Sequence, residues 1–146
     1  MKPRLSRSYL ENLLAGDSYD SLTELWALLE GCDAYDRHRA NYGLTTPLFL
    51  FAESLLWFAQ STRSGMVTYF EVAPAERQQL MAEALLALAP PGFAATYAAG
   101  RASWKDANSM VPLDSWAEQN DDRNNEWLAT LIRQNRQAFE AAVLES

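Results

Sequence analysis

One segment of the chain, residues 48–60, carries apolar side chains around its whole helical circumference, and it constrains the fold more than any other feature. Its large apolar residues are Leu48, Phe49, Leu50, Phe51, Leu55, Leu56, Trp57 and Phe58. A helix that lacks a polar face is usually buried in the centre of a soluble fold. Thr46 and Pro47 precede this segment, and they predict the N-cap and the first helical position. We therefore expect residues 48–60 to form a buried central helix.

The other helices are predicted from caps, helix-breaking residues and apolar side chains at helical spacing. Ser8 and Ser21 are each followed three residues later by a glutamate, which is the pattern of a capping box, and Gly16 and Gly31 can close the helices that these serines open. An alanine-rich segment contains Gly100, which predicts close approach of a neighbouring element. The expected helices cover residues 9–15, 22–30, 48–60, 75–89, 93–103 and 124–144, and residues 66–72 form a short segment of apolar and aromatic residues between two of them. The expected irregular segments are residues 31–45, either a loop or a short polar helix, a loop over 104–113, and a turn at Trp116.

No segment alternates apolar and polar residues over the length of a strand, so β-structure is disfavoured. The chain has 146 residues, close to the usual size of one domain, and no linker rich in glycine, serine or proline divides it. We expect a single all-α domain over residues 1–146, with six or seven helices packed around the buried central helix.

Signals for export or membrane insertion are missing from the sequence. The longest apolar stretch, residues 47–59, is too short for a membrane span, which needs about 20 residues. The basic start of the chain is not followed by the apolar stretch of a secretory signal. Cys32 is the only cysteine, so an internal disulfide is excluded. We expect a cytoplasmic protein that does not bind membranes.

Acidic residues outnumber basic residues and are concentrated in two segments. The chain has 19 Asp and Glu against 12 Lys and Arg, a formal net charge of −7. This balance argues against direct binding of nucleic acid, which needs clustered cations. Residues 11–36 hold seven carboxylates and no Lys or Arg, and residues 114–126 hold five carboxylates with Arg123 as the only cation. Such segments are either solvated faces or, if they share one face, a negative field that attracts a basic partner.

The sequence gives little support to catalysis, metal binding or nucleotide binding. His38 is the only histidine, and with Cys32 and the two aspartates between them it does not complete a tetrahedral metal site. No glycine-rich phosphate-binding motif is present. Asp121 and Asp122 are adjacent, and on a helix adjacent side chains point about 100° apart. We expect no catalytic residue, no metal and no cofactor, and the alternative is an enzyme or small-molecule pocket near Cys32 and His38.

Most of the aromatic residues lie at helical spacing with leucine, which indicates core packing. Trp104 and Trp116 differ because they lie in or beside the polar stretch 101–126. Either one could anchor a partner, since tryptophan is enriched among the residues that dominate binding energy. The alternative is that these two side chains cap the ends of the core.

Residues 63–70 carry a recognisable motif. They read RSGMVTYF, which resembles the Asn-Gly-Gly-Phe-x-Gln-Tyr-Phe signature of a widespread bacterial all-helical domain of unknown function. Gly65, Tyr69 and Phe70 match the signature, and Met66 stands at the position of its first phenylalanine. We interpret these four residues as structural, because glycine permits a tight junction between helices and the aromatic side chains can pack on the central helix.

The resemblance extends over roughly residues 20–140 and implies non-enzymatic binding. The best-characterised relative is the C-terminal-like domain of an acidic DNA-mimic protein, which occupies a DNA-binding protein, and other relatives resemble immunity proteins encoded near bacterial toxins. We therefore expect the chain to bind and neutralise a basic protein, a toxin or a DNA-binding protein, through acidic helical faces. The expected partner-binding residues are Asp17, Asp20, Glu24, Trp104, Asp114, Trp116, Glu118, Asp121 and Asp122. A further alternative is an assembly subunit, such as a homodimer, with an apolar self-interface.

Overall fold

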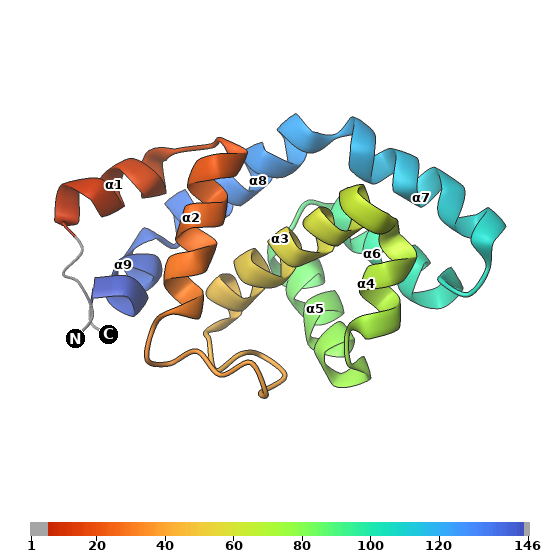
Figure 1. The fold of residues 1–146 in the computed structure, drawn as a ribbon, viewed down its shortest axis with the longest axis horizontal. Helices are drawn as coiled ribbons and strands as arrows, with labels where there is room; N and C mark the ends of the chain where they lie inside the picture. The colour runs from red at the N-terminus through yellow and green to blue at the C-terminus, as the bar shows by residue number, and fades with distance from the viewer. Residues whose placement is uncertain (1–5, 145–146) are drawn as a thin grey trace.

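The chain is all-helical along residues 6–144, the part of it that the computed structural model describes (Figure 1). Its helices are α1 (Arg7–Ala15), α2 (Tyr19–Glu30), α3 (Thr46–Ser64), α4 (Met66–Val72), α5 (Ala75–Leu88), α6 (Pro91–Ser103), α7 (Ala107–Gln119), α8 (Asp121–Gln134) and α9 (Arg136–Leu144). These residues contain no β-strand, which confirms the all-α class. The nine helices of this part of the chain replace the six or seven expected, because α7 forms in place of a loop and the expected C-terminal helix is divided in two.

Helix α3 includes the apolar segment that the sequence marked out, and it runs through the middle of the view in Figure 1. It contacts α2, α4, α5, α7, α8 and α9. Phe51 meets Phe139 of α9 edge to face, with ring centroids 5.3 Å apart, and Trp57 meets Tyr97 of α6 in the same way at 5.1 Å. Neighbouring helices thus cover the apolar surface that α3 would otherwise expose to water. Within residues 6–144, no helix combines the length and the apolar content that crossing a membrane requires.

Helices α1 and α2 are each capped by a serine that precedes the one in the predicted capping box. Ser6, and not Ser8, caps α1, because its hydroxyl accepts a hydrogen bond from the backbone N–H of Tyr9 at 3.0 Å. Ser18, and not Ser21, caps α2 by accepting from the backbone N–H of Ser21 at 3.2 Å. The earlier serine satisfies an unpaired N–H of the first turn and adds residues to the helix, so it is the better cap of the two. Both helices end at the expected glycines.

Helix α7 corrects the expectation of a loop over 104–113 and a turn at Trp116. Asp106 caps this helix, and its side chain accepts a hydrogen bond from the backbone N–H of Asn108 at 3.2 Å. Pro112 lies inside the helix, where proline lacks the N–H of a regular turn, so local signals disfavour a helix here. Packing of α7 against α3, α4 and α6 outweighs that local preference.

The C-terminal segment, expected as one helix over 124–144, is divided at Asn135. This residue has φ −127° and ψ 28°, which lies outside the helical region. Its side-chain amide donates to the carbonyl oxygen of Leu131 at 2.9 Å and so satisfies an acceptor at the end of α8. The break lets α9 turn back and pack against both α2 and α3.

Residues 31–45 form a loop, the first of the two expected alternatives. Arg77 of α5 holds this loop in place through hydrogen bonds of 2.9–3.0 Å to the backbone carbonyl oxygens of Arg37, Arg39 and Ala40. The same guanidinium lies 4.2 Å from the centroid of the Tyr42 ring, which is a cation–π contact. Arg77 therefore fixes Tyr42 in position beside α3.

The motif at residues 63–70 forms the junction between α3 and α4. Gly65 has φ +91° and ψ 148°, a conformation that glycine adopts far more readily than other residues. Asp114 of α7 accepts a hydrogen bond from the backbone N–H of Met66 at 2.7 Å and so satisfies the start of α4. Met66, Tyr69 and Phe70 of the motif are buried. A Cβ atom at Gly100 would lie 2.4 Å from the Phe70 ring, which confirms the expected close approach at this glycine.

Candidate partner-binding site

A groove of about 330 Å³ lies between helices α2, α3 and α8. Its lining residues are Tyr19 of α2, Leu55, Phe58, Ala59 and Thr62 of α3, and Asp121, Asn124 and Asn125 of α8. On α3 and on α8 these residues are three or four positions apart, the spacing that places side chains on one face of a helix. The α3 side forms an apolar floor, and the ends of α2 and α8 supply polar walls. Pockets that hold a small molecule have volumes of about 300 Å³ and more, so the groove is large enough for one long side chain.

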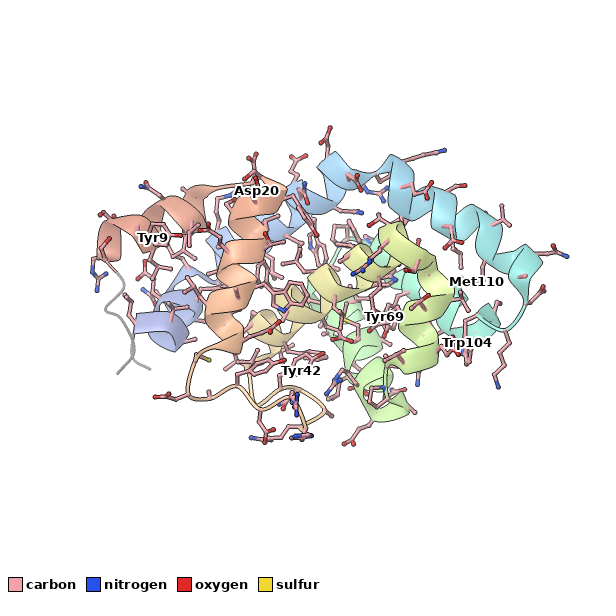
Figure 2. The ribbon with its side chains drawn as sticks, viewed as in Figure 1. Tyr9, Asp20, Tyr42, Tyr69, Trp104 and Met110 are labelled. Carbon is pink, nitrogen blue, oxygen red and sulfur yellow. The ribbon has the colours of Figure 1, made fainter. Side chains whose placement is uncertain are left out.

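The groove brings together two acidic segments that are far apart in the sequence. Helix α2 begins at Tyr19 and helix α8 begins at Asp121, so the N-terminal ends of both helices border the groove. Asp17 and Asp20 flank Tyr19, Asp122 follows Asp121, and all four carboxylates are exposed. Figure 2 shows Asp20 at the end of α2 that lies beside α8, and these two helices are in contact. We call the four carboxylates, Asp17, Asp20, Asp121 and Asp122, the acidic face.

Asn124 lines this groove, and its amide oxygen is buried and unpaired. The residue is only 2% exposed, and its Oδ1 atom has no hydrogen-bond partner among the described residues. A buried acceptor without a partner costs about 1–3 kcal/mol of folding free energy. This oxygen is sealed from solvent as well as unpaired, so a molecule in the groove does not reach it.

None of the residues that line the groove is a lysine or an arginine. The neighbouring cation on α8, Arg123, is directed at aromatic rings. Its guanidinium carbon lies 4.4 Å from the ring centroid of Trp116 and 5.2 Å from that of Phe93. Burial lowers the pKa of Arg123. The lining of the groove therefore carries the negative charge of Asp121 and no positive side chain.

The other carboxylates predicted to bind a partner lie outside the groove. Glu24 accepts a hydrogen bond from the hydroxyl of Tyr9, which joins α2 to α1. Glu118 is exposed on α7. Asp114 is half-buried and satisfies the start of α4, so it has a structural contact that the sequence did not indicate. Of the seven predicted carboxylates, Asp121 lines the groove, and Asp17, Asp20 and Asp122 lie at or next to the helix ends that border it.

The two tryptophans considered as anchors are both half-buried. The ring of Trp116 stacks on Trp57 with centroids 5.7 Å apart, meets Phe93 edge to face at 5.5 Å, and carries the guanidinium of Arg123. Trp104 ends α6, and the ammonium of Lys105 lies 5.3 Å from its ring (Figure 2). Neither tryptophan lines the groove. Their contacts with the core match the alternative in which they cap its ends.

Cys32 and His38 lie in different environments. The thiol of Cys32 is buried with the core, whereas His38 is exposed in the loop. The backbone N–H of His38 donates to Asp36 at 2.9 Å, which is a local turn contact. Among the described residues, no group of three or more His, Cys, Asp or Glu side chains is arranged to hold a metal ion.

A buried carboxylate, Glu53, lies at the centre of α3. Tyr42 and Tyr69 donate hydrogen bonds to its two carboxylate oxygens, each at 2.5 Å, and the hydroxyls of Tyr69 and Tyr97 are 2.9 Å apart. If the carboxylate is ionised, every hydroxyl of this network donates one hydrogen bond, with Tyr97 donating to Tyr69. Figure 2 shows Tyr42 in the loop before α3 and Tyr69 on α4, so the network joins the loop and α4 to α3.

Burial sets the electrostatics of this network. Burial raises the pKa of Glu53, and the hydrogen bonds from the two tyrosines and the charge of Arg77 oppose that effect. Burial and the nearby carboxylate raise the pKa of Tyr42 and of Tyr69. Glu53 is completely enclosed by protein, so the network stabilises the fold and offers no surface to a substrate.

Sequence reasoning did not single out Asn124 or assign a role to Glu53. Asn124 shares a helical face with Leu128 and Leu131, and both leucines are buried. Glu53 interrupts the most apolar segment of the chain. In both cases the available signal was a polar residue at a position where the helical pattern expects an apolar one. Such a residue is buried with a partner or faces a site.

No family model, no curated protein and no solved structure matches this chain. The relation of residues 63–70 to the bacterial all-helical domain therefore stays a prediction.

Proposed function

We propose that the protein is a non-catalytic interaction module of the bacterial cytoplasm. It binds and neutralises a basic protein, a toxin or a DNA-binding protein, through the acidic face. The observation that carries the proposal is that the starts of two acidic helices, at Tyr19 and at Asp121, border one groove whose lining contains no positive side chain. The resemblance at residues 63–70 adds support, because the relatives it implies are acidic binding proteins.

Electrostatic attraction explains how such a face would work. Clustered carboxylates raise the rate at which a basic protein associates, and they repel the phosphates of DNA. A partner whose basic surface is covered in this way cannot use that surface for nucleic acid. The attraction weakens as salt shortens the Debye length from about 10 Å at 0.1 M to about 3 Å at 1 M.

The test begins with the capture of a partner from the native cell extract. Association rates are then measured at low and high salt for the parent chain and for a variant with Asp17→Asn, Asp20→Asn, Asp121→Asn and Asp122→Asn. We expect the variant to associate at least about tenfold more slowly at low salt, and the difference to shrink at 1 M salt.

A control variant carries four neutralised carboxylates on other parts of the surface, Glu71→Gln, Glu76→Gln, Glu83→Gln and Glu118→Gln. All four residues are exposed. Equal slowing by both variants would show that only net charge matters, and this would contradict a specific face. Binding that persists unchanged at 1 M salt would favour an apolar interface and the assembly-subunit alternative.

A further inference from the structure

We propose that residues 35–44, within the loop between α2 and α3, form a strap that opens as a local unit while the helices stay folded, and that Arg77 fastens it. The acidic face lies at the start of α2 and the strap follows its end, so this device is separate from the proposed function (Figure 1). Three observations carry the inference: the hydrogen bonds of Arg77 to the strap, a strained tyrosine within it, and a groove of which the strap is one wall.

Two side chains join the strap to the helices in the described part of the chain. Arg77 of α5 donates from its Nε and Nη2 atoms to three backbone carbonyl oxygens of the strap, and Tyr42 of the strap donates to Glu53 of α3. Residues 36–39 are all exposed, so burial contributes little to holding this part of the strap. Two of the three carbonyl oxygens that Arg77 reaches belong to these exposed residues, so the arginine holds the part of the strap that burial does not hold.

The strap contains a strained turn. The backbone N–H of Leu44 donates to the carbonyl oxygen of Asn41 at 3.0 Å, and the two residues between them both have positive φ, +57° at Tyr42 and +73° at Gly43. Such turns favour asparagine, aspartate and glycine at these positions, and Tyr42 is the only residue other than glycine with positive φ in the described part of the chain. A strained residue persists only while its surroundings enforce the conformation. Loss of the contacts of the Tyr42 ring or hydroxyl therefore lets the strap relax into another conformation.

A groove of about 280 Å³ lies between the strap, the start of α3 and α5. Asn41 and Leu44 of the strap line one side of it, and Leu80 is among the residues of α5 that line the other. Arg77 lies three positions before Leu80 on α5, so it fastens the strap on the face of α5 that forms the groove wall. Opening of the strap removes one wall of this groove, so the position of the strap sets the size of the groove.

Hydrogen exchange of the full, isotope-labelled chain under native conditions tests whether the strap opens by itself. The reporter amides are those of Asp36, which donates to the carbonyl oxygen of Tyr42 at 2.9 Å, and of Tyr42, which donates to that of Arg39 at 3.0 Å. The reference amides lie in the middle of α3 and α8. Small amounts of urea should accelerate the reference amides, whose exchange requires global unfolding, and should leave the reporter amides unchanged, because a local opening exposes little surface.

Three variants test the role of Arg77. Arg77→Met keeps an unbranched side chain but removes every donor, and we expect it to accelerate exchange of the reporter amides about tenfold, which corresponds to about 1.4 kcal/mol. Arg63→Met, the matched control, makes the same change at an exposed position in the last turn of α3 and should leave the reporters unchanged. Ile132→Val weakens the packing of the buried face of α8, so it should accelerate the reference amides severalfold and leave the reporters unchanged.

Three results would overturn the inference. Reporter amides with the same urea dependence as the reference amides would show that the strap unfolds only with the helices. Equal acceleration of reporters and references by Ile132→Val would show the same. Equal effects of Arg77→Met and Arg63→Met on the reporters would show that Arg77 does not fasten the strap.

Discussion

Replacing Glu53 with glutamine tests whether the buried carboxylate makes the stability of this fold depend on pH. Burial raises the pKa of Glu53 above its ordinary value of 4.5, although Tyr42, Tyr69 and Arg77 all act in the opposite direction. The folded chain therefore holds a proton at this site more tightly than the unfolded chain does. By linkage, the stabilisation from this proton is complete below about pH 4.5 and is lost as the pH rises through the folded pKa.

The size of this pH dependence follows from the binding of a single proton. Between the unfolded and the folded pKa, the contribution of Glu53 to the free energy of unfolding falls by at most about 1.4 kcal/mol per pH unit. Glutamine keeps an oxygen that can accept from one tyrosine hydroxyl, and it does not ionise. The stability of the parent minus that of Glu53→Gln should therefore be greatest at acid pH and should decrease toward neutral pH.

Urea unfolding measures this difference when it is followed by tryptophan fluorescence and repeated from about pH 4 to pH 8. The parent and the variant share every other titratable group, so the effects of those groups cancel in the difference. Glu118→Gln makes the same chemical change at an exposed position and serves as the control. A difference between parent and Glu53→Gln that stays constant, or increases with pH, would refute the argument that burial dominates the electrostatics of Glu53.

Asp114→Ala should lower the free energy of unfolding by about 0.5–2 kcal/mol, because the first turn of α4 loses its hydrogen-bond acceptor, and Asp114→Asn should lower it less. Equal melting temperatures for the parent and both variants would contradict this capping role. Gly65→Ala should lower the free energy of unfolding by about 1–3 kcal/mol, and Gly65→Val should lower it more, because φ at this position is +91°. If calorimetry gives either variant a melting temperature as high as that of the parent, the backbone explanation is wrong. Trp57→Ala should lower the free energy of unfolding in urea by about 3–5 kcal/mol, because the indole ring is fully buried. Trp57→Phe should lower it less, because the indole N–H that is lost has no hydrogen-bond partner among the described residues. An unchanged urea midpoint for Trp57→Ala would argue against a place for this side chain in the core.

Some elements could be read from the sequence because their causes are local. The apolar segment 48–60 lies within α3, and the short apolar-aromatic segment 66–72 coincides with helix α4 (Met66–Val72). Periodicity, glycine and proline act within one or two turns, so these signals survive without knowledge of the fold. Caps were less certain, because two serines lay within reach of the same helix start. Helix α7 was missed because Pro112 weakens the local signal while the contacts with α3, α4 and α6 stabilise the helix.

The sequence by itself determined an all-helical, acidic chain with one central apolar segment and two acidic segments. Only the tertiary structure decided which carboxylates do what: Glu53 is enclosed by tyrosines, Asp114 caps a helix 48 residues away, and Asp121 reaches a groove beside Tyr19. The physical reason is that hydrophobic pattern and capping act along the chain. A hydrogen-bond partner or a groove wall is supplied by residues that only the packing of helices brings together.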